Sequence, residues 1–188
     1  MHDVFVPSAF SSGFFDPHVL PEWRYRIPAF SRITPGLGAM ALGTARTAIE
    51  TLKEIAGVKT PIRSTQTLCD TPDAQARVAQ AEALVRSARL FLFDALGQLW
   101  TTLLASGEVT MEARALTRLA TSHAASSAVQ AVDLMYVAGG GNSIYVNCPL
   151  ECAVRDVHIG HSHIAIQPCV TYATGRVLFG LDSDAPLL

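Results

Sequence analysis

The residues whose types and spacing best suit chemistry lie between positions 136 and 168, which read YVAGGGNSIYVNCPLECAVRDVHIGHSHIAIQP. Three consecutive glycines, Gly139, Gly140 and Gly141, have no Cβ atoms and let backbone amides approach a ligand closely. Pro149 follows at a position that suits the first turn of a new helix. The combination is typical of a cradle for an anion, although glycine after a helix also serves as a plain C-terminal stop.

The same stretch carries three histidines, His158, His161 and His163. Imidazole titrates near neutral pH, so a histidine can transfer protons, and it also binds metals. On one continuous helix His158 and His161 share a face, whereas His163 lies about 200° around the axis from His161, so the three cannot hold one ion. We therefore expect no metal site. From the spacing alone, hydrogen-bonded bundle histidines are the simpler interpretation.

Four helical patterns must position these residues. Apolar residues at spacings of three and four, together with proline, threonine and glycine at the ends, predict helices over 35–57, 72–106, 110–138 and 150–180, the last with a break at Pro168. Thr34 is the expected N-cap of the first helix. Because the connections are short, the predicted fold is all-α, an antiparallel up-and-down four-helix bundle.

The first part of the chain has a different character. Residues 1–30 contain prolines at positions 7, 17, 21 and 28, and DVFV is their only strand-like run. A strand needs neighbours to satisfy its backbone groups. We expect 1–30 to be an extended segment that belongs to a structure other than the bundle, and 31–188 to form the helical bundle domain.

Composition narrows the function classes. Apolar residues make up 49% of the 188 residues and charged residues only 16%, against about 25% charged in typical soluble domains, so some apolar surface is expected to face a partner. The net charge of -2 and the scattered basic residues argue against nucleic acid. No apolar run reaches the roughly 18–20 residues of a membrane span, and no targeting segment begins the chain. A cytoplasmic protein is expected.

The order of segments resembles the C-terminal half of the acyl-CoA dehydrogenase superfamily. In this resemblance the chain would pass from a β domain into the bundle at DVFVP. The first bundle helix would contain LGTARTAIETLKEIAG, and the glycine and histidine stretch would follow. The chain is most similar to the flavin-dependent monooxygenases that include hydroxyphenylacetate, hydroxysteroid-ring and dibenzothiophene oxygenases. The motif that carries this resemblance comprises Gly139-Gly140, Pro149-Leu150-Glu151, Arg155-Asp156 and His163.

One position separates the branches of this superfamily. The dehydrogenases commonly place a catalytic carboxylate, within a Tyr-Glu-Gly-Thr motif, eight residues after the aspartate of the Arg-Asp pair; here that position is Ile164. Isoleucine cannot act as a general base, which disfavours the usual α,β-dehydrogenation. The monooxygenase branch has a histidine one residue earlier, where this chain has His163. The resemblance implies that His163 lies near the reactive face of a reduced flavin, where it would stabilise the hydroperoxide formed with oxygen or handle protons.

The resemblance also implies where a flavin, FMN or FAD, would be held. Gly139, Gly140 and Gly141 would offer backbone amides to the phosphate or ribose of a flavin shared with a neighbouring subunit, and Arg63 and Ser64 would lie near its phosphate. A homo-oligomer, a dimer or a tetramer formed through the bundle, is expected for the same reason.

For Glu151 and Arg155, four residues apart, the simplest role is a helix ion pair.

These observations favour the C-terminal domain of a flavin-dependent oxygenase that hydroxylates an aromatic or polycyclic substrate, with a flavin reductase as a partner. Full-length family members have a helical domain and a β domain before this region, so flavin binding by this chain alone is expected to be weak or absent. Two alternatives stay open. One is an acyl-CoA dehydrogenase-like domain with an atypical base, and the other is a non-catalytic oligomerisation module or truncated remnant.

Overall fold

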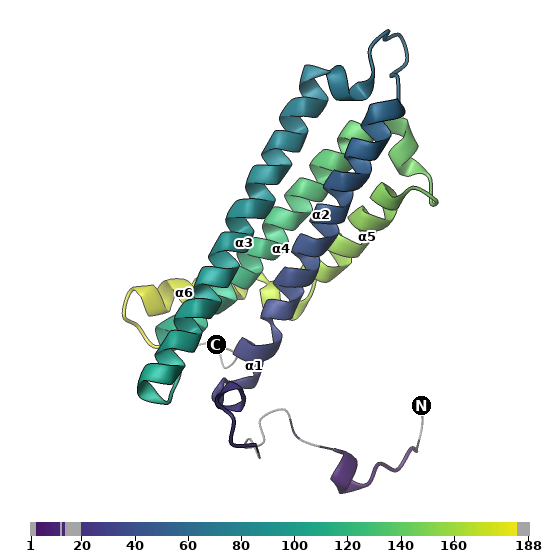
Figure 1. Cartoon of the computed structure of the whole chain (residues 1–188). Coiled ribbons are helices and arrows are strands. Elements are labelled where there is room, and N and C mark those ends of the chain that lie inside the picture. The colour runs from purple at the N-terminus through teal and green to yellow at the C-terminus, as the bar shows by residue number, and fades with distance from the viewer. Residues whose placement is uncertain (1–2, 12, 14–19, 184–188) are drawn as a thin grey trace.

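The computed structural model describes residues 3–11, 13 and 20–183, and within these residues all regular structure is helical. Four long helices lie side by side: α2 (Pro35–Val58), α3 (Pro72–Ser106), α4 (Met111–Gly139) and α5 (Pro149–His161) (Figure 1). The short helix α1 (Ala29–Ile33) leads into α2, and α6 (Pro168–Leu178) packs against α4. The expected all-α bundle is confirmed.

Short 3-10 turns lie before α1 and between the longer helices. They are η1 (Ser8–Phe10), η2 (Trp23–Arg26), η3 (Leu68–Asp70), η4 (Gly140–Ile144) and η5 (Ile164–Ile166). The last two matter most for function, because η4 contains two of the three consecutive glycines and η5 directly follows His163.

Local signals explain where the long helices begin and end. Pro72 starts α3, and Gly107, at φ 79°, ends it in the left-handed conformation that glycine adopts without strain. The hydroxyl of Thr110 accepts a hydrogen bond from the N–H of Ala113 at 3.2 Å and caps α4. Thr34 does not act as the expected cap: α1 runs directly into α2, and its hydroxyl donates to the carbonyl of Phe30 instead.

Helix α4 lies at the centre of the bundle and contacts α2, α3, α5 and α6. Its buried face is made largely of alanines, which let neighbouring helices approach closely. At the α2–α4 contact a Cβ atom on Gly38 would lie 3.3 Å from both the Cβ of Ala124 and the carbonyl oxygen of Thr121. A bidentate ion pair between Arg46 and Glu82, at 2.5 and 3.0 Å, joins α2 to α3.

The expected fourth helix is two helices. Helix α5 ends at His161, seven positions before Pro168, so the predicted run of helix through His163 is wrong. The chain turns here because side chains of α4 bind the carbonyl groups of Ala165 and Ile166, which an uninterrupted helix would use internally. His163 therefore lies in a connection, not on a helix face.

The described part of the N-terminal segment is extended, as expected, and makes no strand pairing. Val4, Phe5 and Val6 are exposed, and Figure 1 shows this segment running away from the bundle. Among the helices of the described residues, none has the length and apolarity that crossing a membrane requires.

Candidate functional site

The predicted site residues fall into two groups at opposite ends of α5. The glycine triplet precedes α5 through η4, whereas His163 follows its last turn. A helix of 13 residues is about 20 Å long. One chain therefore does not bring the glycines and His163 together around one small group.

At the first end, the three glycines differ in what surrounds them. A Cβ atom on Gly139 would collide with the hydroxyl of Ser143 and would lie 2.8 Å from Cδ1 of Leu150, so only glycine fits there. Gly140 has φ 59°, and a Cβ on Gly141 would meet nothing within 4 Å. Gly139 is therefore required by packing, while Gly140 and Gly141 are exposed.

A groove of about 740 Å³ lies between this glycine turn and the end of α2. Its apolar lining includes Ile55, Val58 and Leu68, and its polar lining includes Lys59, Thr60 and Asn142. Lys59 donates from Nζ to the carbonyl of Gly139 at 2.5 Å, which places an ammonium group beside the turn. Apolar surface beside a cation and open backbone suits a ligand with an aromatic ring and an anionic group.

The loop residues predicted to meet a phosphate lie at the same end but do not line the groove. Arg63 is exposed and has a left-handed backbone, φ 65°. The hydroxyl of Ser64 donates to the carbonyl of Gln66 and accepts from its N–H, both at 3.0 Å. Lys59, not Arg63, is the basic residue in the groove. Its contact with a residue 80 positions away could not be read from local sequence.

At the other end, His163 is the first residue of a tight turn. Its Nδ1 accepts a hydrogen bond from the N–H of Ala165 at 3.1 Å. A neutral imidazole that accepts at Nδ1 carries its proton on Nε2, so Nε2–H is the donor available to a ligand. The side chain is exposed, and so is Ile164 beside it.

Three polar residues of α4 hold this turn in place. Arg118 donates from Nη2 to the carbonyl of Ala165 at 2.9 Å, and Ser122 donates to the carbonyl of Ile166 at 3.0 Å. The hydroxyl of Ser126 lies 3.2 Å from Nε2 of His161. Arg118 is only 2% exposed, and burial lowers the pKa of its guanidinium. These positions are four residues apart and so share one face of α4.

The remaining candidate residues serve separate contacts. His158 lies 3.0 Å from Asp133 through Nε2, so the three histidines have three different partners. The expected pair between Glu151 and Arg155 is confirmed at 3.5 Å. No group of three or more metal-binding side chains gathers anywhere in residues 3–11, 13 and 20–183.

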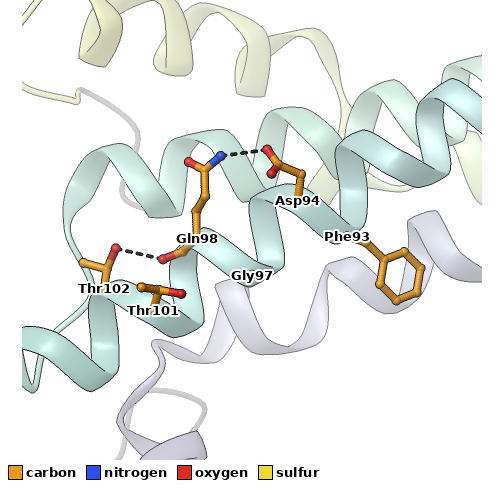
Figure 2. A pocket seen from close by; sticks show the side chains of 6 residues that line it. All are labelled: Phe93, Asp94, Gly97, Gln98, Thr101 and Thr102. Carbon is orange, nitrogen blue, oxygen red and sulfur yellow. Dashed lines mark hydrogen bonds between the residues drawn. The ribbon is translucent and has the colours of Figure 1, made fainter.

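A hollow on the exposed side of α3 is not a competing site. Figure 2 shows that Phe93 points away from the other lining side chains. Gln98 donates to Asp94 at 2.7 Å, and Thr102 donates to the backbone carbonyl of Gln98 at 2.8 Å. Because its polar groups bind one another along the helix, this hollow offers little to a ligand.

Comparison with known proteins identifies the family. The sequence profile described as "Acyl-CoA dehydrogenase, C-terminal domain" matches residues 35–168, more than half of the chain. The chain belongs to this family. Within the family it is 33% identical to the indole-3-acetate monooxygenase of Pseudomonas putida over 160 residues. The aligned residues cover 85% of this chain and 41% of that protein. This similarity confirms the resemblance to the monooxygenase branch.

Two further relatives extend over nearly the whole chain. An indole-3-acetate monooxygenase of Acinetobacter baumannii is 27% identical over 181 residues, which cover 96% of this chain and 46% of that protein. The solved structure of XiaF from Streptomyces sp. in complex with FADH2 and glycerol has a TM-score of 0.82 at 19% identity, covering 92% of this chain and 44% of that one. The latter likeness shows the shared fold. The chain spans less than half the length of the curated relatives it matches.

Proposed function

We propose that this chain is the C-terminal domain of a flavin-dependent oxygenase that hydroxylates an aromatic or polycyclic substrate. The observation that carries this proposal is the His163 turn. The imidazole is fixed through Nδ1, no hydrogen bond of its Nε2 is found within the described residues, and the neighbouring Ile164 offers no carboxylate to remove a proton. The aromatic substrate is supported by the names of the indole-3-acetate monooxygenases.

The groove beside the glycine turn suits part of a flavin, FMN or FAD. The exposed backbone of Gly140 and Gly141 and the ammonium of Lys59 would hold a phosphate, and apolar side chains would pack against a ring. Arg63 and Ser64, in the adjoining loop, would contact the outer part of the same group. When bound, the reduced flavin supplies the activation of oxygen. His163 would hold a proton at Nε2 and donate it. Because the glycine turn and His163 lie at opposite ends of α5, the groove of one chain and the His163 turn of a neighbouring chain would meet the same flavin.

We also propose that the protein assembles as a homodimer or homotetramer through the bundle. Leu90, Phe93, Trp100 and Leu104 form an exposed apolar row on α3, and Leu90 is 69% exposed. Surface of this kind typically marks an interface. Residues 1–30 would then belong to a preceding β domain and 31–188 to the bundle domain. A flavin reductase would supply reduced flavin in the cytoplasm.

A flavin titration tests this function. Chain 1–188 and a Lys59→Met variant are titrated with FMN and FAD, oxidised and reduced, and quenching of flavin fluorescence is followed for the oxidised forms and absorbance for the reduced forms. We expect weak, saturable binding that the variant weakens further. Complete absence of binding would favour the non-catalytic module, and reduction of bound FAD by an acyl-CoA thioester would favour the dehydrogenase alternative.

A further inference from the structure

The polar row on α4 that holds the His163 turn has a fourth member. Arg114, Arg118, Ser122 and Ser126 follow one another at intervals of four, so they lie along one face of the helix. Arg118 and Ser122 bind the connection between α5 and α6, and Ser126 contacts His161, the last residue of α5. Arg114 has no such contact. No hydrogen bond or ion pair of its side chain is found among the described residues, and its Nε is buried without a partner.

The surroundings of Arg114 disfavour the charged form of its guanidinium. Arg114 is partly buried, and its desolvation lowers the pKa of the guanidinium. The charge of Arg118, one turn along, repels it and adds to the positive potential of the region. The first turn of α4 begins at Met111, so the positive end of the helix dipole lies close by as well. Buried charged groups in proteins are normally paired, so a guanidinium whose buried Nε has no partner in the described residues favours an anion beside it.

The nearby acidic residues do not supply this anion. Glu108 and Glu112 are exposed, and neither forms an ion pair with Arg114 in the part of the chain that the structure describes. A guanidinium presents parallel N–H groups that match the two oxygens of a carboxylate. Arg118 donates from Nη2 to the carbonyl of Ala165, whereas no protein acceptor of the Arg114 guanidinium is found among the described residues. A single fork suits a carboxylate better than a phosphate, which usually gathers several donors.

We propose that Arg114 binds the carboxylate of an aromatic acid substrate. The inference rests on the proposed function, because it places the acid near the catalytic turn. Arg114 is one helical turn from Arg118, and Arg118 binds Ala165, two residues after His163. The carboxylate site and His163 are therefore on the order of 10 Å apart, within the span of a substrate that carries an acidic side chain on an aromatic ring.

The test compares three probes on chain 1–188. Indole-3-acetate carries a ring and a carboxylate, indole-3-acetamide has the same shape without the charge, and acetate has the charge without the ring. Thermal unfolding midpoints are measured against probe concentration for the native chain, Arg114→Met and Arg89→Met. Arg89 is an exposed arginine on α3 and serves as the charge-matched control.

We expect indole-3-acetate to stabilise the native chain and Arg89→Met, and its apparent affinity to fall about tenfold or more in Arg114→Met. Without probe, Arg114→Met should be at least as stable as the native chain, because the variant loses a desolvated charge but no hydrogen bond. Equal effects of indole-3-acetate and indole-3-acetamide, or unchanged binding by Arg114→Met, would overturn the proposal. So would the absence of any stabilisation of the native chain by indole-3-acetate.

Acetate distinguishes the two possible partners of Arg114, which are the carboxylate of a substrate and an acidic side chain of the protein. If acetate binds as tightly as indole-3-acetate, the ring contributes nothing and the partner of Arg114 is an acidic side chain of the protein, which overturns the substrate assignment. The flavin titration is repeated with Arg114→Met. Normal flavin binding together with a lost carboxylate effect supports both proposals, whereas a carboxylate effect without flavin binding sinks only the oxygenase function.

Discussion

Arg118 of α4 donates a hydrogen bond to the carbonyl of Ala165 at 2.9 Å and so fixes the turn that carries His163, 47 positions from the arginine. The N–H of the same Ala165 binds Nδ1 of His163 at 3.1 Å. One peptide residue thus connects a buried guanidinium to an exposed imidazole. The orientation of His163 depends on α4 as much as on its own neighbours in sequence.

Replacing Arg118 by methionine is expected to lower the free energy of unfolding by about 1–3 kcal/mol, because the carbonyl of Ala165 loses its buried donor. Urea denaturation measures the change. Arg155→Met, which removes an exposed arginine that contacts Glu151 and Cys152 on its own helix, should leave the free energy of unfolding nearly unchanged. Equal effects of the two substitutions would show that Arg118 does not hold the turn.

His163→Asn tests the proposed chemistry apart from the turn. Asparagine can accept the N–H of Ala165 through its side-chain oxygen, as histidine does through Nδ1, but it cannot exchange protons near neutral pH. In an oxygenase assay of a protein containing this domain, we expect hydroxylation to fall about 100-fold or more. Thermal unfolding should change little. Full hydroxylation activity in His163→Asn would remove His163 from the mechanism.

Gly139→Ala and Gly141→Ala should differ although the two residues are neighbours in the triplet. The new Cβ at position 139 would collide with Ser143 and Leu150, which is expected to cost about 1–3 kcal/mol of folding free energy. At position 141 the Cβ meets nothing within 4 Å, so stability should be nearly unchanged. Chemical denaturation of both variants provides the comparison, and equal losses would contradict the described packing of the turn.

Glu82 predicts an acid-dependent loss of stability. Hydrogen bonds from Arg46 and then Arg86 lower the pKa of its carboxyl from 4.5 to about 2. A lowered folded-state pKa stabilises the native state above pH 4.5, and this stabilisation disappears as the pH falls towards 2. Glu82→Gln should therefore cost about 1 kcal/mol or less at pH 7 and clearly less near pH 2.

The control for this experiment is Glu54→Gln, which alters an exposed glutamate of α2 for which the described residues supply no ion pair. The measurement is urea denaturation from pH 2 to 7 for all three proteins. A constant difference between Glu82→Gln and the native chain across this range would contradict the proposed linkage.

The apolar row on α3 predicts the assembly state. Leu90→Lys combined with Trp100→Lys should shift the sedimentation coefficient from that of a dimer or tetramer to that of a monomer, because two charges cannot be buried in an apolar contact. Ile159→Lys alters an equally exposed apolar residue on α5 and should leave the assembly intact. If the double variant keeps the native sedimentation coefficient, the interface lies elsewhere.

The sequence predicted the features that depend on local signals. Pro72 and Gly107 mark the ends of α3, and Thr110 caps α4, because helix ends are governed by residues within one turn. The end of α5 could not be found in this way. No proline or left-handed glycine stops the helix at His161, and the side chains of Arg118 and Ser122 that favour the turn come from a distant part of the chain.

The candidate site was predicted only in part for the same reason. Three adjacent glycines are visible in sequence, but their separate roles follow from contacts with Ser143 and Leu150. Lys59 contacts the turn across 80 positions. Arg114 became a candidate only because its buried Nε has no partner in the described part of the chain. Neither a long-range contact nor its absence leaves a periodic pattern that sequence analysis can detect.

The length of α5 also determines how changes at its two ends combine. The glycine turn and the Arg118–Ala165 contact are separated by about 20 Å and share no partner among the described residues. Energetic effects at such distances add. The loss of folding free energy in a Gly139→Ala, Arg118→Met double variant should therefore equal the sum of the two single losses. A substitution at one end of α5 should have the same effect on stability whichever residue is present at the other end.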